Sequence, residues 1–491
     1  METSTRAILM AGAAVSAALA TRSVLHALVV MASCGLACAA LESIGAARRA
    51  NQVERAWSLR RRRFDLSPSG GFLPEVEPSS VKLPREFAPW EALASQLPRL
   101  NRSGELRAAV EALPLLRAEG LLLVTPYEAR SACVRRAYVA LGLAVHSYAY
   151  GHKADWSALP PDKSAETREP CSSTSEEDDA ADAAPRQLPP QLAVPWLWLC
   201  AQLDLPTGAI TAAGTDLWNW RRVPAGRFEL VFSMTGTATE SAFHELATRT
   251  HVRMGTLLPE LLAAPEAVSA GDDRAVLELL RGCEAALRDT RRIFDEVWQT
   301  VDAAVFYEVY RPLLSGSWDA PLSMVTADGT STPARSKGPS AGQSTVFLLL
   351  DLALGIRNAA LDGPDDSPHS SFQVEMLAYM PAPHRVCARV FADALADVGS
   401  LAEYVAVRQK KKTGPRSYLM GRRLRRALDD ALESYAQFRK FHLVVATRYL
   451  KRTTTGTGGS DFPAMLRDGI ERTLATQHDG LDQHPNQRKT D

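Results

Sequence analysis

The sequence predicts an all-α protein, with a large C-terminal helical domain and a smaller, mostly helical domain before it. Three long stretches repeat apolar residues at three- and four-residue steps, the spacing of an amphipathic helix: 272–310, 344–361 and 421–450. The alternation of apolar and polar residues that is typical of strands is confined to 227–234, and no fixed-period repeat occurs. We therefore expect helices packed on helices around one apolar core.

Composition and charge exclude several classes of protein. The 491 residues carry 56 Lys and Arg against 56 Asp and Glu, so no basic field indicates nucleic acid and no acidic field indicates a basic partner. The seven cysteines are odd in number and include no CxxC pair, which argues against a disulfide framework and against a zinc finger. A reducing compartment is the simplest expectation.

Residues 1–63 form a hydrophobic N-terminal segment with a basic flank. Residues 7–47 are rich in Ala, Val and Leu, and Ser23–Leu41 contains no Asp, Glu, Lys or Arg, which meets the minimum length of a membrane span. Arginines are frequent in 48–63. Three interpretations stay open: a membrane anchor that leaves the rest of the chain in the cytoplasm, an organelle-targeting peptide, and an ordinary buried helical hairpin.

The remaining chain divides by composition. Pro, Ser and Gly are frequent in 64–86, which predicts a linker, and a small helical domain is expected over 87–226. That domain is interrupted by 160–190, a net-negative stretch without aromatic residues that we expect to be a disordered surface insertion. A large domain follows over 227–480, and 481–491 is a tail.

One helix carries a titratable residue on its apolar face. The following residues share one stripe at helical spacing: Leu428, Leu432, Tyr435, Phe438, His442, Val445 and Tyr449. An inward histidine is either a core residue bonded to a carbonyl or an axial ligand of haem iron. Zinc is disfavoured, because no HExxH motif or other His/Cys cluster supplies three or four ligands.

Five motifs occur in a characteristic order. They are "FYEVYRPLLSG" at 306–316, "GPSAGQSTVFLLLDLALGI" at 338–356, "YMPAPHR" at 379–385, "FRKFHLVVATRYL" at 438–450 and "GTGGSDFPAML" at 456–466. In this order and spacing they resemble the indoleamine 2,3-dioxygenase family of haem enzymes. The resemblance is strongest over 227–480 and weaker over 87–226, where "LDLPTGAI…DLWNW" still matches the small-domain segment of the family.

The resemblance implies a cofactor, haem b, held between helices of the large domain, with the small domain covering the distal side. His442 matches the proximal iron ligand, and Asp351 matches a buried carboxylate that would support the imidazole directly or through Arg439. Ser340 and Ala341 match small residues at the haem edge, where Ser340 would bond a propionate or cap the following helix.

The resemblance also assigns substrate contacts. Arg311 matches the arginine that binds the substrate carboxylate, a role suited to a guanidinium because the pairing can be bidentate. Phe306 and Phe243 match aromatic residues that pack on the indole, and Thr457 would offer its hydroxyl to the ammonium group from a Gly-rich lid. Arg311 before Pro312 also fits a cation at the C-terminus of a helix, and "GTGGS" also fits a plain linker.

Several positions depart from the family pattern. His244 stands where a second aromatic residue is common, and it is either a distal hydrogen-bond donor to bound oxygen or a surface histidine. Ala247 lies where several relatives carry serine, and Pro339 replaces a glycine. The segment at 211–220 lacks a tyrosine and a cysteine found in some members.

These observations lead to one hypothesis with two rivals. The first is a haem-dependent dioxygenase that opens the indole ring of L-tryptophan or a related indoleamine with O2, giving N-formylkynurenine and requiring an unidentified electron donor. No protein general base is obligatory in this scheme. The second is a haem-binding sensor or oxygen-binding protein of the same fold with little tryptophan turnover, and the third is a membrane-tethered scaffold without cofactor, which rests on residues 1–63 alone.

Overall fold

The structure is a computed structural model. It describes residues 57–68, 70–159, 186–317, 320–363, 370–410, 414–450, 453–457 and 459–479. The predictions for 1–47, for 160–185 and for 481–491 lie outside these residues. No helix within the described ranges is both long and apolar enough to cross a membrane. Arg60–Asp491 is a compact unit and is described here by itself, and the predicted domain boundary at residue 226 stays a prediction.

The all-α prediction is confirmed. The helices are α2 (Ala88–Ser103), α3 (Leu106–Glu111), α4 (Tyr127–Tyr150), α6 (Pro190–Leu203), α7 (Ala238–Gly255), α8 (Leu258–Leu261), α9 (Ala264–Ala270), α10 (Asp273–Asp295), α11 (Val297–Thr300), α12 (Arg311–Leu313), α13 (Thr345–Leu354), α14 (Ala359–Asp362), α15 (Ser370–Leu377), α16 (Ala382–Val398), α17 (Leu401–Lys410), α18 (Pro415–Tyr449) and α19 (Phe462–Asp479). Two π-helical turns, η6 (Ala213–Leu217) and η8 (Val305–Tyr310), interrupt this pattern.

The short strands are secondary to the helices. They are β1 (Arg186–Leu188), β2 (Trp220–Val223), β3 (Arg227–Leu230), β4 (Leu322–Val325) and β5 (Ser331–Ala334). β2 and β3 form an antiparallel hairpin, so the predicted strand at 227–234 is present in its first half. β1 pairs with β4 in parallel and β4 pairs with β5 antiparallel, which joins chain segments that lie far apart in sequence.

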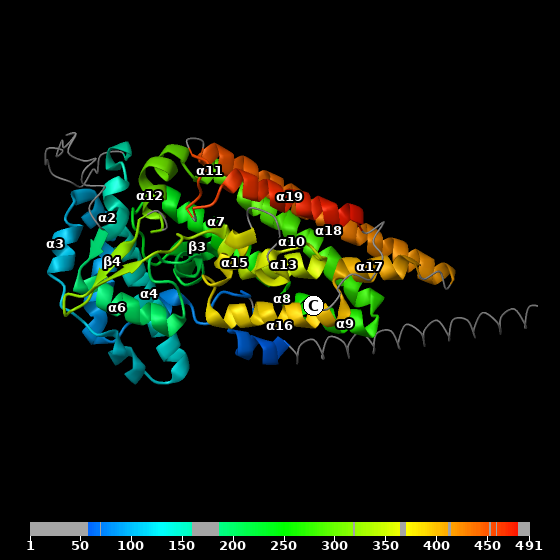
Figure 1. Cartoon of the computed structure of the whole chain (residues 1–491), viewed down its shortest axis with the longest axis horizontal. Coiled ribbons are helices and arrows are strands. Elements are labelled where there is room, and N and C mark those ends of the chain that lie inside the picture. Colours follow the sequence, from blue (N-terminus) through cyan, green and yellow to red (C-terminus); the bar gives the residue numbers. More distant parts are fainter. Residues whose placement is uncertain are drawn as a thin grey trace, which may run out of the picture. The chain divides into compact units, whose positions relative to one another are not determined.

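The core that positions the site is built on α18. This 35-residue helix, about 52 Å long at 1.5 Å per residue, packs against α10 and α19, and the three run side by side in Figure 1. Pro415 at its first turn fits the missing backbone N–H there. α10 begins at Asp272, whose carboxylate accepts from the backbone N–H groups of Arg274 and Ala275. A long rigid helix with tertiary partners on two sides fixes the positions of the residues on its inner face.

The segment predicted as a linker is instead packed. Residues 64–86 contain little regular structure, but Phe64, Leu66, Phe72 and Leu73 are each at most 3% exposed. Pro, Ser and Gly give this stretch its irregular backbone, while its large apolar side chains give it a place in the core. The composition of this stretch predicts its irregular backbone, but it does not show that its apolar side chains are buried.

A buried histidine ties the small-domain helices to the site. His146 of α4 donates from Nδ1 to the Leu313 carbonyl at 2.8 Å, and its Nε2 accepts from the Ile210 backbone N–H at 2.7 Å. This arrangement requires the neutral ring, and burial lowers the pKa of His146 to about 4. The imidazole therefore joins three chain segments by two hydrogen bonds, and protonation of Nε2 would break the one that it accepts from Ile210.

We expect acid to destabilise the protein through such residues. Burial lowers the pKa of His146 to about 4 and that of His384 to about 3, against about 6.5 in an unfolded chain. The unfolded state therefore takes up protons first, so stability is complete above pH 6.5 and falls as the pH decreases toward 4, by up to about 1.4 kcal/mol per histidine and pH unit. Urea midpoints at pH 7.5 and 5.5 measure this loss.

The His384→Phe variant isolates one of these residues. His384 is 1% exposed and packs on Phe72 with ring centroids 4.6 Å apart, so a phenyl ring suits its surroundings. This variant should lose less stability between pH 7.5 and 5.5 than the parent protein, whereas the exposed His152→Ala control should match the parent. An identical loss in the parent and in His384→Phe would contradict the assignment.

Candidate functional site

His442 occupies an aromatic environment on the inner face of α18. Phe438, one turn earlier, and Phe294 of α10 lie 6.4 and 6.0 Å from its ring, measured between centroids. Burial among these groups lowers the pKa of His442 to about 4, so the imidazole is neutral at pH 7. Its side chain keeps some exposed surface, and no described residue forms a hydrogen bond with either ring nitrogen. A neutral imidazole with an uncommitted nitrogen is the form that ligates a metal.

The predicted apolar stripe around this histidine is confirmed. Its other members are all buried: Leu428, Leu432, Tyr435, Phe438, Val445 and Tyr449. Phe347 of α13 extends the wall, because its ring stacks on Phe438 at 5.4 Å with an interplanar angle of 7°. Such a wall of aromatic and aliphatic groups can pack against a flat apolar macrocycle.

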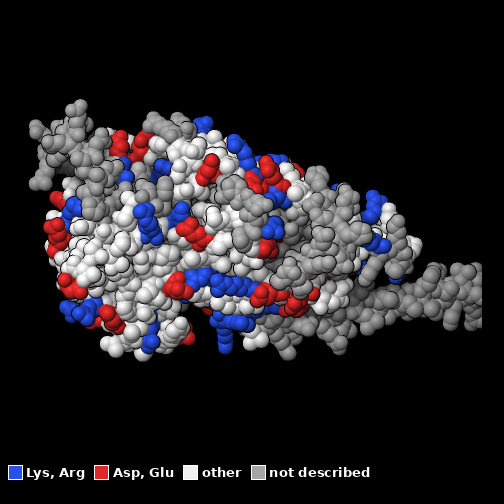
Figure 2. All heavy atoms as spheres, viewed as in Figure 1, with Lys and Arg blue, Asp and Glu red and all other residues white. Residues whose placement is uncertain are grey.

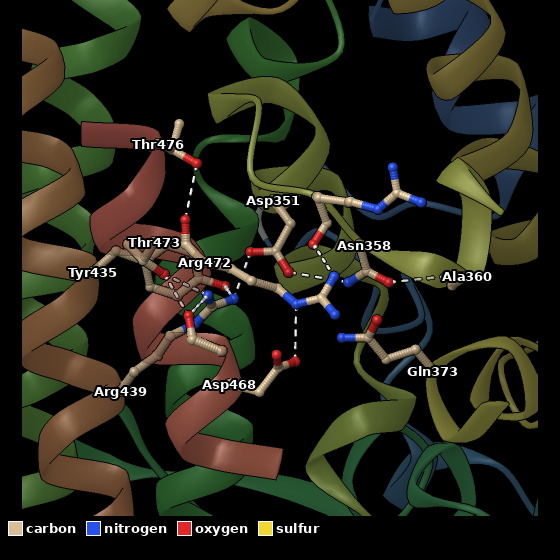
Figure 3. A network of polar contacts seen from close by, with 12 residues as sticks. Asp351, Asn358, Ala360, Gln373, Tyr435, Arg439, Asp468, Arg472, Thr473 and Thr476 are labelled. Carbon is tan, nitrogen blue, oxygen red and sulfur yellow. Dashed lines mark hydrogen bonds and ion pairs between the residues drawn. The ribbon is translucent and has the colours of Figure 1, made fainter. Parts of the chain in front are cut away.

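An ion pair lies one helical turn before His442. The Arg439 guanidinium donates to Asp351 at 2.6 Å, and Asn358 donates to the other carboxylate oxygen at 3.0 Å, as Figure 3 shows. Burial raises the pKa of Asp351, and the Arg439 charge opposes that rise. The buried carboxylate of Asp351 thus has a cationic partner, while the action of this pair on His442 stays a proposal.

Arg439 is held by more than the carboxylate. It donates to the Gly469 carbonyl at 2.6 Å, to the Tyr435 hydroxyl at 3.0 Å and to the hydroxyl of Thr473. Gly469 and Thr473 come from α19, so the network in Figure 3 fastens the last helix to α18 and α13. A guanidinium with four partners has little freedom to move, and it fixes the backbone next to His442.

Breaking this pair should be costly. Asp351→Ala leaves the Arg439 charge buried without its carboxylate, and loss of one partner of a buried pair typically costs about 3–5 kcal/mol. The double variant Asp351→Leu/Arg439→Met removes both charges and should recover much of that loss. Urea unfolding of the three proteins measures it. Exposed Arg426–Asp430 on the same helix is the control pair, and its disruption should cost less than about 1 kcal/mol.

Arg311 lies at the junction of η8 and α12. One terminal nitrogen donates to the Thr455 carbonyl at 2.8 Å, and Nε is buried without an acceptor among the described residues. Desolvation lowers the pKa of Arg311, and the guanidinium remains charged at pH 7. Arg311 is the C-cap of η8 and lies in the last turn of the three-residue α12, so its position also fits the predicted cation at the C-terminus of a helix. A half-buried cation with an unused donor is suited to bind a carboxylate.

The Gly-rich segment is docked next to this arginine. Thr457 donates from its hydroxyl to the Pro339 carbonyl at 2.7 Å, and its own carbonyl accepts from the Gly338 N–H at 3.3 Å. A Cβ on Gly338 would lie 2.1 Å from the Leu314 carbonyl oxygen, so only glycine permits this approach. The Thr457 hydroxyl oxygen retains a lone pair for a further donor.

Aromatic rings converge from α7 and η8. Phe243 and Phe306 are in contact at 5.1 Å between ring centroids, and Phe306 meets Tyr449 of α18 edge-on at 5.7 Å. The structure thus brings both predicted indole contacts together. Phe306 precedes Arg311 by five residues in the sequence. The π-helical turn contributes to this geometry, because its extra residue changes the direction of the side chains that follow.

His244 differs from both sequence-based interpretations. Its side chain is 4% exposed, so the surface alternative is wrong. Nδ1 bonds the Asp216 carboxylate at 2.5 Å, and Nε2 bonds the Tyr310 hydroxyl. Because both nitrogens are engaged, neither N–H is free for bound oxygen. The partners of His244 lie 28 and 66 residues away, so its neighbours in the sequence do not indicate them.

The other predicted positions are less constrained. Ser340 is the N-cap of a short 3-10 turn at Ala341–Gln343, accepting from the Gly342 N–H at 3.3 Å, which is the capping alternative. Ala341 is exposed and Ala247 is partly exposed. Within the described ranges, no three His, Cys, Asp or Glu residues converge to hold a metal ion. A haem iron needs only one or two protein ligands, so this finding is compatible with His442 as a ligand.

Comparison with known proteins identifies the family. The family model described as indoleamine 2,3-dioxygenase matches residues 60–454. The chain belongs to the indoleamine 2,3-dioxygenase family. The family assignment makes it a member of a group of oxidoreductases that act as dioxygenases, and it covers the helices that carry Arg311, Asp351 and His442.

Characterised relatives span fungi and mammals. A 6-hydroxytryptophan 2,3-dioxygenase of Fusarium equiseti is 27% identical over 82% of this chain and 88% of the relative. Indoleamine 2,3-dioxygenase 1 of Rattus norvegicus is 26% identical over 80% of this chain and 90% of its own length. An indoleamine 2,3-dioxygenase of Aspergillus candidus is 25% identical over 84% and 96%. The matches extend over 88%, 90% and 96% of the length of these relatives.

Proposed function

We propose that this member of the indoleamine 2,3-dioxygenase family binds haem b through His442 and cleaves the indole C2–C3 bond of L-tryptophan with O2, giving N-formylkynurenine. Both oxygen atoms enter the product, so the reaction consumes no external reductant beyond an unidentified donor that keeps the iron ferrous. The observation that carries the proposal is the half-buried Arg311 guanidinium, with an unused donor, five residues after Phe306, whose ring contacts Phe243. That combination suits an amino acid with a flat apolar side chain.

The residues around His442 fit a haem. The ring is neutral, lacks a hydrogen bond within the described part of the chain, and lies against Phe294 and Phe438. Asp351 and Arg439 would hold the supporting helix turn, and Ser340 and Ala341 would line the edge. Activation of O2 is the chemistry that haem supplies when bound.

The chain itself supplies binding and orientation. Arg311 would grip the substrate carboxylate through Nε and a terminal nitrogen, while the Thr457 hydroxyl oxygen would accept from the ammonium group. Phe306 and Phe243 would enclose the indole and exclude water. The scheme needs no proton transfer to a side chain, which agrees with the absence of a general base from the predicted contacts. The name of the Fusarium equiseti relative supports a substrate range that includes ring-substituted tryptophans.

Product analysis tests this proposal. The full chain, loaded with haem and chemically reduced, is mixed with L-tryptophan and ¹⁸O2, and products are followed by mass spectrometry. We expect N-formylkynurenine with two heavy oxygen atoms. A haem-loaded protein that binds O2 reversibly and forms no such product would instead support the second candidate, an oxygen-binding protein or sensor of the same fold. The committed nitrogens of His244 and the exposed Ala341 are the observations that favour this alternative.

A further inference from the structure

Three polar side chains form a continuous buried chain beside the aromatic residues. Asp216 bonds His244, and His244 bonds Tyr310, with side-chain exposures of 16% and 4% for the first two and full burial of Tyr310. The ends of the chain come from the two π-helical turns, η6 and η8, and the middle comes from α7. π-helical turns occur often at functional sites, since the extra residue re-aims a side chain at a cost in regular bonding.

This chain lies against the rings that the proposed function assigns to the indole. His244 meets Phe243 edge-on at 5.2 Å, and Tyr310 lies 6.1 Å from both Phe243 and Phe306, between ring centroids. η6 also reaches the loop that carries Ser340, because the Ala212 backbone N–H donates to the Gln343 side chain at 2.7 Å. Asp216 thus belongs to a turn whose N-cap residue is bonded to the segment predicted at the haem edge.

The hydrogen bonds of Asp216, His244 and Tyr310 show which of their atoms can accept a further donor. With Asp216 as acceptor, His244 carries its proton on Nδ1, and Nε2 then accepts from the Tyr310 hydroxyl. The Asp216 Oδ1 atom receives His244 and, at 3.3 Å, the Thr215 hydroxyl. Its Oδ2 atom receives no donor from the described residues, although the side chain is mostly buried. A carboxylate oxygen without a protein donor can accept a hydrogen bond from a ligand.

We infer that Asp216, held in position by His244 and Tyr310, accepts a hydrogen bond from a donor on the aromatic part of the substrate. The donor is either the indole N–H or a hydroxyl on the benzene ring, which share this chemistry. This inference rests on the proposed function and adds a specificity residue to it. His244 is a positioning residue, because it acts through the carboxylate that it orients.

Ligand discrimination tests the inference. Affinities of the haem-loaded ferric protein are measured from the Soret shift for L-tryptophan, 1-methyl-L-tryptophan and 5-hydroxy-L-tryptophan. If the ring N–H is the donor, tryptophan should bind roughly 10-fold or more tightly than its methylated form; if a hydroxyl is the donor, the hydroxylated form should bind tighter than tryptophan by a similar factor. Ratios of kcat/KM for the same ligands should follow the affinities.

Two variants distinguish the effect of the hydrogen bond on the affinity ratio from the effect of the shape of the site. Asp216→Asn keeps the shape and, with its oxygen engaged by His244, presents an N–H₂ donor to the ligand, so the preferred ratio should fall to about 1. His244→Phe removes the support and should weaken the same ratio, whereas Asp328→Asn in the exposed β4–β5 turn should leave it unchanged. A steric effect of the methyl group would persist in Asp216→Asn.

Two results would overturn the inference. Equal affinities for all three ligands in the parent protein would do so, as would an unchanged ratio in Asp216→Asn. If tryptophan is still cleaved in either case, the proposed function stands and only the role of Asp216 falls. If no indole ligand shifts the Soret band and none is cleaved, both fall together.

Discussion

The His442→Ala protein is expected to lack the Soret band that the haem-loaded parent protein shows. Among the described residues on this part of the α18 face, only His442 has a side-chain nitrogen that is free to bind iron. Alanine has no such atom. The absorption spectrum after reconstitution with haem and gel filtration measures the effect. Circular dichroism should show the parent's helical content, because the core around α10 and α18 remains apolar.

A control on the same helix makes the result specific. Val444→Ala changes an exposed side chain two residues away and should leave haem content unchanged. Imidazole added to His442→Ala should restore part of the band, since a free ligand can enter the space left by the side chain. A full Soret band in His442→Ala without added imidazole would end the assignment of this residue as the iron ligand.

Arg311→Ala is expected to raise KM for L-tryptophan by roughly 100-fold, while the Soret spectrum stays intact. A bidentate guanidinium–carboxylate pair contributes about 3 kcal/mol, because each hydrogen bond to a charged group is worth about 1.5–3 kcal/mol. Arg311→Lys keeps the charge but loses the planar fork, so its KM should lie between those of the parent and of Arg311→Ala. Steady-state kinetics at pH 7 measures all three.

A surface arginine serves as the matched control. Arg389 of α16 is exposed, and Arg389→Ala should leave KM and kcat unchanged. Tryptamine, which lacks the carboxylate, should bind the parent and Arg311→Ala equally. Unaltered tryptophan kinetics in Arg311→Ala would show that the carboxylate binds elsewhere.

The sequence predicted well those features that depend on local periodicity. The stripe of α18 follows from 3.6-residue spacing, and it placed His442 among aromatic residues before any tertiary contact was known. The resemblance paired Asp351 with Arg439 as one way to support the imidazole, and the two side chains form an ion pair in the structure.

Features that depend on tertiary contacts could not be predicted from the sequence. The π-helical turns have no simple periodic signal, and Tyr310 looked like one more aromatic residue in "VFYEVY". His244 was interpreted from its own neighbours, although its partners arrive from η6 and η8. An acid in "GTDLWNW", surrounded by small and aromatic residues, was the one available sign that Asp216 is special. Residues 64–86 were misjudged because composition does not show which apolar side chains are buried.

The bond between Arg311 and the Thr455 carbonyl has a thermodynamic consequence. One guanidinium serves two purposes at once: a terminal nitrogen holds the Gly-rich segment, and Nε remains for a ligand. Any carboxylate that immobilises Arg311 therefore also strengthens the hold on Thr455, and by linkage the docked segment raises affinity for the carboxylate by the same factor. If Arg311 binds the substrate carboxylate as proposed, a product that binds Arg311 more weakly would also weaken the docking of the Gly-rich segment and so leave faster.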